Sequence, residues 1–210
     1  MLFRSRVLLD AVREQAAARG FQPKPRPAPA KAKDVDSPFT PVLKEAVKGY
    51  EQFVRVSGEA KVAPTACKLP PTLARLSTAE KEHGQKLYLL YARMADNLDY
   101  VKKGEPAQVG QTLVKESWQC VDGPQKGPTE ASKRYQFGAP VRREGDQVSH
   151  AGAFHGLFVM HKLAPTTPDT DQGWIYGTID RDGIVTAVGQ VASCMKCHQE
   201  APEDRRFGMQ

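Results

Sequence analysis

The chain has 210 residues, of which 40% are hydrophobic and 8% aromatic, and this is enough to bury the core of one globular domain. Its net charge of +6 arises within residues 1–33, which hold eight of the 30 basic residues and two of the 24 acidic ones, so the remainder is neutral. A basic tail on a neutral body argues against a domain that reads nucleic acid, and no basic stripe interleaved with aromatic residues is found.

Residues 1–37 are predicted to form a basic extension, and residues 38–210 the folded domain. Within the extension, residues 5–19 could form a short amphipathic helix. Residues 21–33 carry four prolines among Lys, Arg and Ala, a composition that favours extended polyproline conformation and cannot build a core.

A helix is predicted over Pro41–Arg55, because apolar residues recur there at i, i+3 and i+4. Thr40 followed by Pro41 is typical of a helix start. The three prolines between Ser57 and His83 prevent regular structure, so this connection is unusually long for a compact domain.

A short strand is predicted over Lys86–Tyr91, a helix over Met94–Lys103 that Gly104 ends, and a second strand over Gly110–Trp118. Side chains of a strand alternate between its two faces. The second strand therefore has one face with Leu113, Lys115 and Ser117, and another with Thr112, Val114, Glu116 and Trp118.

No element is predicted between Cys120 and Phe154, where Gly, Pro and charged residues are frequent; a loop of this length usually serves as a lid or is disordered. Strands return over Gly156–Leu163 and Gly173–Asp180, and the turn Asp182-Gly183 leads into a strand over Ile184–Val188. A small antiparallel β-sheet with two or three helices is an α+β fold.

The sequence Cys194-Met195-Lys196-Cys197-His198 has the Cys-x-x-Cys-His pattern of covalent haem c attachment. Each thiol can add across one haem vinyl group, and the histidine can ligate the iron. In a helix capped by Ser193, the residues Cys194, Cys197 and His198 lie at i, i+3 and i+4, on one face. One covalently attached haem c is therefore expected at a C-terminal helix.

Two other uses of the motif stay open. A structural zinc site would need a fourth ligand. The candidate ligands are His83, His150, His155 and His161. None of them has the short paired spacing that is usual in zinc modules. A Cys194–Cys197 disulfide is less favoured, because a thioredoxin-like motif opens an early helix, whereas this motif closes the chain.

The other two cysteines, Cys67 and Cys120, could form a disulfide. Haem c is attached outside the cytoplasm in bacteria, and disulfides also persist there, so a periplasmic or otherwise extracytoplasmic protein is expected. The apolar run Val7–Leu9 is cut by Asp10, far short of the apolar core of a signal peptide. We therefore expect that the natural start lies upstream or that a signal has been lost. No stretch is long enough to cross a bilayer.

Several segments in order resemble the cytochrome P-460 family, whose relatives include cytochrome c′-beta. They are KLYLLYARMADNLDYVKKGEPAQVGQTLVKESW, GLFVMHKL, GWIYGTI and CMKCH. The likeness extends from about residue 85 to the end of the chain. It implies a mono-haem protein with an open iron face that handles small nitrogen species, exchanges electrons with a redox partner protein, and forms a homodimer.

The resemblance assigns a role to Lys115. In family members called cytochrome P-460, a lysine of the Val-Lys-Glu strand is cross-linked to the haem, and these proteins oxidise hydroxylamine. Cytochrome c′-beta lacks the cross-link, has an aromatic distal pocket and binds nitric oxide. The alternative for Lys115 is a solvated surface lysine, because isolated lysines on strands are mostly exposed.

The resemblance also places Phe158 where the enzymes carry a distal acid. This argues against hydroxylamine oxidation, because proton transfer needs a titratable group within hydrogen-bond reach of the substrate. His155, His161 or Glu116 could take that role.

The alternative function is electron transfer by a six-coordinate iron, with the sulfur of Met160 or Met209 opposite His198. A methionine on a strand is more often core filler. Trp174 and Tyr176 alternate on one strand face and are expected to pack around the haem edge. Whether the protein is an enzyme or a binder stays open from the sequence.

Overall fold

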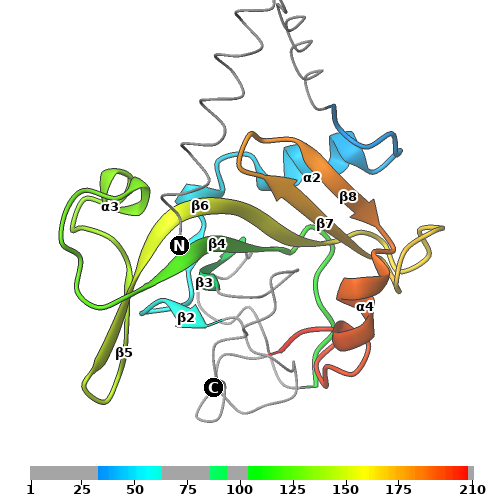
Figure 1. Cartoon of the computed structure of the whole chain (residues 1–210). Coiled ribbons are helices and arrows are strands. Elements are labelled where there is room, and N and C mark those ends of the chain that lie inside the picture. The colour runs from blue at the N-terminus through cyan, green and yellow to red at the C-terminus, as the bar shows by residue number, and fades with distance from the viewer. Residues whose placement is uncertain (1–32, 63–85, 94–103, 208–210) are drawn as a thin grey trace, which may run out of the picture. The chain divides into compact units, whose positions relative to one another are not determined.

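The computed structural model describes residues 33–62, 86–93 and 104–207 (Figure 1). The helices are α2 (Thr40–Val47), the 3-10 helix η1 (Tyr50–Gln52), α3 (Glu130–Arg134) and α4 (Ala192–His198). The strands are β1 (Val54–Arg55), β2 (Lys61–Val62), β3 (Lys86–Arg93), β4 (Thr112–Asp122), β5 (Val141–Glu144), β6 (Gln147–Lys162), β7 (Trp174–Asp180) and β8 (Val185–Gly189).

These strands form one antiparallel sheet in the order β1-β3-β4-β6-β7-β8. The two remaining strands pair at its margins, β2 with β3 and β5 with β6. The centre consists of β4 and β6, the two longest strands, of 11 and 16 residues. With few and short helices, the architecture is mainly antiparallel β and is compatible with the predicted α+β class.

The register places rows of side chains across one face of this sheet. One row runs through Leu90, Lys115, Phe158, Thr178 and Ala187, each paired with the next in the adjacent strand. Because alternate residues of a strand face opposite sides, residues two positions away in each strand form parallel rows on the same face.

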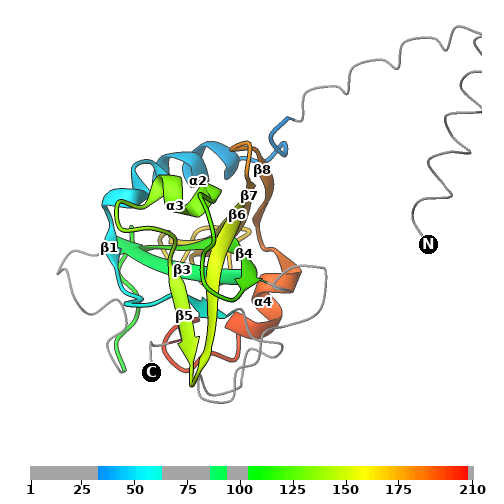
Figure 2. The ribbon, with the colours of Figure 1, turned by 60° about the vertical axis from the view of Figure 1, so that its left-hand side comes forward.

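The opposite face is covered by α2. Leu43 of α2 is fully buried there, among Leu89, Val114 and Val159 of the sheet. A Cβ added at Gly177 of β7 would lie 2.3 Å from Cδ2 of Leu43, so the missing side chain lets the helix approach the strand closely. Figure 2 shows α2 and α3 on one side of the sheet.

The second core lies on the face that carries Lys115. Leu113, Met160, Trp174 and Tyr176 are buried in it, and Cys194 and Met195 of α4 pack against it. In Figures 1 and 2, α2 and α4 lie on different sides of β7 and β8. The sheet therefore has one face packed by helices and another that receives the Cys-x-x-Cys-His segment.

The strand predictions around the motif are confirmed: Lys86–Tyr91 lies within β3, Gly110–Trp118 overlaps β4, and the hairpin at Asp182-Gly183 joins β7 to β8. Gly183 has φ +80° in that turn, a conformation that glycine adopts without steric cost. Asp180 Oδ1 accepts the backbone N–H groups of Asp182 and Ile184, both at 2.9 Å, and so closes the turn.

The predicted helix over Pro41–Arg55 is wrong in its second half. α2 ends at Val47, and Gly49 with φ +67° turns the chain into η1 and then β1. The helix start also differs, because the N-cap is Phe39 and Thr40 is already helical. Thr40 Oγ1 instead donates a hydrogen bond of 2.7 Å to the Val35 carbonyl.

The predicted loop between Cys120 and Phe154 is also wrong, since it contains α3, β5 and the first half of β6. Thr129 caps α3: its hydroxyl accepts the Ser132 N–H at 3.0 Å, and the Ser132 hydroxyl accepts the Thr129 N–H at 2.8 Å. β5 and β6 are joined by the two residues Gly145 and Asp146, a loop length and composition typical of a hairpin.

Several predictions lie outside the described residues: the amphipathic helix over 5–19, the Pro-rich segment, the Met94–Lys103 helix and most of the connection before His83. The domain boundary at residue 38 stays a prediction. In the described part of the chain, no helix has the length and apolar character needed to cross a membrane.

Candidate haem site

The motif residues lie together on α4, which follows β8. The helix begins at Ala192 with Val191 as N-cap and no side-chain cap, so the predicted capping role of Ser193 is wrong. Cys194, Cys197 and His198 are half-buried. The other side of the helix is exposed, at Ala192, Ser193 and Lys196. The three motif side chains therefore share the face of α4 that is turned toward the protein, as their spacing predicts.

None of the seven residues of α4 is fully buried. A helix this short is not stable by itself, because few hydrogen bonds offset the entropy lost in its nucleation. Apolar packing usually supplies the rest, and α4 has little of it. A large apolar group bonded to the half-buried face would provide the missing contact, so the helix fits a covalently held haem.

The protonation of His198 is fixed by the segment that follows α4. Its Nδ1 lies 2.7 Å from the carbonyl oxygen of Arg205, and since a carbonyl only accepts, Nδ1 carries the proton. Nε2 then has the free lone pair that an iron ligand needs. The ring also packs against Tyr176 and Phe207, at centroid distances of 5.6 Å and 5.4 Å.

Burial lowers the pKa of His198, and this effect is opposed by its hydrogen bond to Arg205. The imidazole is therefore predominantly neutral at pH 7, which is the form that binds a metal. With respect to tautomer and charge, His198 matches the requirements of an axial iron ligand.

Lys115 lies on the same face of the sheet as α4. Its side chain is half-buried, and Nζ lies 4.3 Å from the centroid of the Tyr88 ring and 6.0 Å from that of Phe158. Burial, with the positive charge of Lys86 as a smaller cause, lowers the pKa of Lys115 to about 8, and Cys194 opposes this shift. A larger fraction of its amine is thus neutral at pH 7 than for an ordinary lysine.

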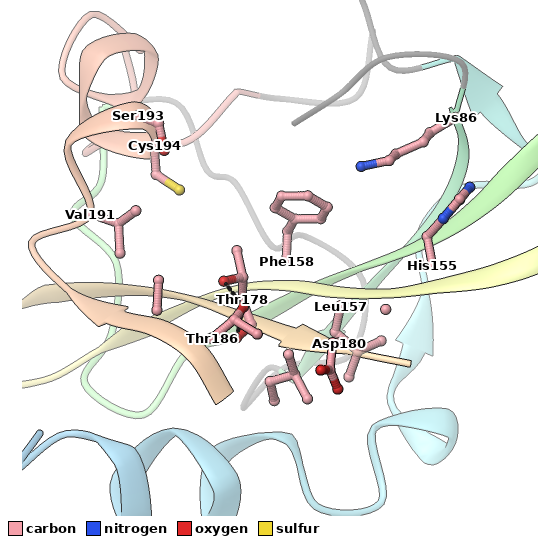
Figure 3. A pocket seen from close by; sticks show the side chains of 13 residues that line it. Lys86, His155, Leu157, Phe158, Thr178, Asp180, Thr186, Val191, Ser193 and Cys194 are labelled. Atoms are coloured by element: carbon pink, nitrogen blue, oxygen red, sulfur yellow. Dashed lines mark hydrogen bonds between the residues drawn. The ribbon is translucent and has the colours of Figure 1, made fainter. Parts of the chain in front are cut away.

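A cavity of about 320 Å³ opens beside this face. Its lining residues come from β3, β6, β7, β8 and α4: Lys86, His155, Gly156, Leu157, Phe158, Thr178, Ile179, Asp180, Thr186, Ala187, Val191, Ser193 and Cys194. Figure 3 shows the ring of Phe158 in its middle, with Cys194 on one side and Lys86 and His155 on the other. The structure thus brings Phe158, Lys115 and the motif helix to one face of the sheet.

The candidate proton donors differ in position. His155 lines the cavity and is exposed; partial burial and the charges of Lys86 and Arg181 lower its pKa. His161 is engaged by Thr112, with its Nδ1 2.9 Å from the hydroxyl, and both residues alternate to the other side of the sheet. Glu116 is fully buried on that other side as well.

Glu116 is held by donors from its own strand β4 and from two other elements. Tyr50 of η1 donates to Oε2 at 2.7 Å, and Trp118 Nε1 donates to Oε1 at 2.6 Å. Tyr135, just after α3, also donates to Oε1, and Arg134 lies 3.7 Å from Oε2. These contacts direct the carboxylate away from the cavity.

The state of the cysteines bears on both disulfides that the sequence left open. Cys120 is a free thiol, so the predicted Cys67–Cys120 disulfide is not formed, and Cys67 itself lies outside the described residues. Cys194 is not disulfide-bonded, which excludes a Cys194–Cys197 disulfide here, whereas Cys197 is disulfide-bonded. Haem attachment requires the thiol of Cys197 in reduced form.

The geometry gives little support to an axial methionine ligand or to a structural zinc site. Met160 is buried beside Leu113 and Tyr176 as part of the core, and Met209 lies outside the described residues. His150 Nδ1 is 2.8 Å from the Gly123 carbonyl oxygen, at the other end of β6 from the motif. Across residues 33–62, 86–93 and 104–207, no group of three or more metal-ligating side chains forms a metal site by itself.

The segment after the motif makes contacts that the sequence pattern did not predict. Asp204 accepts hydrogen bonds from Lys162 Nζ at 3.0 Å and from the Ala107 N–H at 2.7 Å. Its carbonyl accepts Trp174 Nε1 at 3.0 Å. Arg206, which is 3% exposed, donates to the Glu105 carbonyl at 2.7 Å. The charged run Glu203–Arg206, directly behind the histidine, was the available signal.

Two comparisons bear on the family. The family model described as cytochrome P460 matches residues 72–206, which is more than half of the chain. A comparison with curated proteins returned no match. The matched range includes Lys115, Phe158 and the whole Cys-x-x-Cys-His motif. The chain therefore belongs to the cytochrome P460 family, and this membership implies that it binds haem c.

Proposed function

We propose that this protein is a mono-haem c-type cytochrome that binds a small nitrogen species, nitric oxide in preference to hydroxylamine, at an open iron face. Cys194 and Cys197 would attach the haem, and His198 would ligate the iron. The haem supplies an iron that can change its oxidation state and bind a diatomic ligand. The expected compartment is extracytoplasmic, where haem c is attached in bacteria and where a redox partner protein would meet it.

The observation that carries this proposal is the hydrogen bond between His198 Nδ1 and the Arg205 carbonyl. It assigns the tautomer with a free Nε2, on a helix whose two motif cysteines share the same half-buried face.

The preference for a neutral diatomic ligand rests on the cavity. Phe158 and Leu157 contribute apolar surface there, and Oδ1 of Asp180 accepts two backbone N–H groups of the turn after β7. His155, which is exposed, and Lys86 lie on the opposite side of Phe158 from Cys194. Oxidation of hydroxylamine needs a proton acceptor beside the bound substrate, whereas binding of nitric oxide does not.

Lys115 could still be cross-linked to the haem. Such a bond would replace one amine N–H and one haem-ring C–H, which is a two-electron oxidation. It would require an added peroxide, which the two electrons and two protons released would convert to water. The lowered pKa of Lys115 supports this step, because only the neutral amine has a lone pair to form the bond.

The test uses the protein purified with its haem. Optical spectra of the reduced protein, recorded with and without nitric oxide, are expected to change on addition of the gas. An unchanged spectrum would indicate a saturated iron and support six-coordinate electron transfer instead. Turnover of hydroxylamine with an electron acceptor would show that the protein is a hydroxylamine-oxidising enzyme and not only a binder of nitric oxide.

Mass spectrometry tests covalent haem attachment and the Lys115 cross-link separately. The denatured protein is expected to keep the mass of one haem, and a mass without this adduct would contradict covalent attachment. After digestion, full recovery of an unmodified peptide containing Lys115 would exclude the cross-link. The variant His198→Ala, with both cysteines kept, should retain the adduct but lose the wild-type spectrum.

A further inference from the structure

The carbonyl group that fixes His198 belongs to a turn with unfavourable local geometry. Asp204 and Arg205 have φ values of +47° and +67°, and they lie between Glu203 and Arg206, which form an isolated β-bridge. Two consecutive non-glycine residues in left-handed conformation cost free energy. Contacts from outside the turn must therefore hold this carbonyl in place.

Arg205 has such a contact with Asp171. Its Nε and Nη2 each donate a hydrogen bond of 3.0 Å, one to each carboxylate oxygen of Asp171. The side chain of Asp171 is 5% exposed and that of Arg205 is 19% exposed, so the pair is largely shielded from solvent. A bidentate pair fixes orientation as well as distance. It ties the turn to the sheet, because Asp171 bridges to Trp174 at the start of β7.

Asp171 also reaches His198 by a second path. The hydroxyl of Tyr176 donates to Asp171 Oδ2 at 2.9 Å, and the Tyr176 ring packs on the His198 ring. His198, Arg205, Asp171 and Tyr176 thus form a closed ring of contacts. Within this ring, Asp171 orients both the group that accepts the Nδ1 proton and the aromatic ring beside the imidazole.

We propose that Asp171 and Arg205 are positioning residues that set the electron-donor strength of His198 toward iron. This inference rests on the proposed function, in which His198 is the axial ligand. A short Nδ1–H hydrogen bond leaves more electron density on the imidazole, which stabilises ferric over ferrous iron and lowers the reduction potential. Release of the turn would weaken that bond and raise the potential.

The pair offers a test that separates positioning from simple electrostatics. Asp171→Asn removes a negative charge near the iron, and Arg205→Gln removes a positive one. If only charge mattered, the first variant would raise the potential and the second would lower it. If positioning dominates, both variants raise the potential, since each breaks the bidentate contact.

The experiment measures the reduction potential of the haem-loaded protein, together with the iron–histidine stretching frequency of the ferrous form by resonance Raman spectroscopy. Both variants are expected to shift the ferric-to-ferrous equilibrium by about tenfold toward ferrous, which is 59 mV for one electron. The stretching frequency should fall in both. Arg205→Lys, which keeps the charge and part of the hydrogen bonding, should shift both quantities by less.

The matched control is the exposed pair Arg181–Glu130, 3.3 Å apart, where Glu130→Gln should leave potential and frequency unchanged. Two outcomes would overturn the inference. One is that Asp171→Asn and Arg205→Gln shift the reduction potential in opposite directions. The other is that potential and frequency stay unchanged in Arg205→Lys and in whichever of those two variants folds. Absence of an iron–histidine mode from the wild-type protein would instead contradict the proposed function, so the two failures are distinguishable.

Discussion

Lys115 and Glu116 are adjacent in β4 and experience opposite surroundings. Glu116 is fully buried and accepts hydrogen bonds from the side chains of Tyr50, Trp118 and Tyr135. The ammonium of Lys115 lies among aromatic rings and near a second lysine, Lys86, and its pKa falls to about 8 because of burial first and that charge second. The carboxylate is therefore surrounded by hydrogen-bond donors, whereas burial disfavours the ammonium.

The lowered pKa predicts a dependence of stability on pH in protein that lacks haem. Between about 8 and the ordinary value of 10.5, the unfolded chain binds more protons at Lys115 than the folded chain, so the free energy of unfolding rises with pH. Lys115→Met removes this penalty. The variant should be more stable than the parent at pH 7 by about 1–3 kcal/mol, allowing for partial exposure, and the gain should shrink toward pH 10.

Urea unfolding at pH 7 and pH 10 measures this difference. Lys115→Arg, which keeps its positive charge at both pH values, is the control and should show no gain. An equal gain for Lys115→Met at both pH values would attribute the effect to packing and not to charge.

The motif residues could be predicted from the sequence, whereas the residues that contact them could not. The spacing of Cys194, Cys197 and His198 predicts a shared face, which depends only on helix geometry. Alternation separates Lys115 from Glu116 but does not tell which of them faces α4. That choice depends on packing between elements far apart in sequence, as does the contact between His198 and Arg205.

Glu116 also joins secondary-structure elements. Through Tyr50 it binds η1, and through Arg134 and Tyr135 it binds the end of α3, so one carboxylate connects two helices to the central strand. Because the network is buried, each of its hydrogen bonds to the charged group contributes more than a surface contact.

Glu116→Gln is expected to reduce the free energy of unfolding by about 2–3 kcal/mol. The carboxylate accepts hydrogen bonds from hydroxyl and indole groups, whereas the NH2 group of the amide would itself be a donor and could not accept them. The haem spectrum should be unchanged, because Glu116 lies on the face away from Lys115. Denaturant unfolding and an absorption spectrum measure both effects. Glu144→Gln removes the ion pair between the exposed Glu144 and the half-buried Arg142, and it should cost less than about 1 kcal/mol. An equal cost in both variants would argue against the network.

Elements with a strong apolar pattern were predictable, and those defined by turns were not. β3, β4 and β7 have buried apolar residues on at least one face along their length. β5 and the first half of β6 are polar and partly exposed, so the two-residue loop Gly145-Asp146 is their main local signal. The second half of the predicted helix failed because its apolar residues Tyr50 and Phe53 pack through η1 and the segment after it.

In the described part of the chain, the sheet separates two cores that differ in how well their side chains are buried. The core on the α2 side contains large buried side chains from the helix and six strands. The core on the other side is closed by α4, whose own residues are half-buried or exposed. The α2 side should therefore be stable with or without cofactor, whereas α4 depends on it.

Amide hydrogen exchange tests this separation. In haem-free protein, the amides of α4 should exchange quickly, while those of β4 and β6 stay protected. Loading with haem should slow the exchange of α4 by at least tenfold and change the central strands little. Equal protection of α4 in both forms would show that the helix needs no cofactor contact.

The division of each strand between two faces has a consequence for divergence within the family. Lys115 and Phe158 lie on the face that we propose binds the haem, whereas their neighbours in sequence, Val114 and Val159, belong to the core on the α2 side. Effects of mutations at sites without shared partners are nearly additive, whereas those of contacting residues are not. With the haem bound as proposed, chemistry at the iron would change through a few coupled positions on one face, while the stabilising core on the reverse face would vary independently.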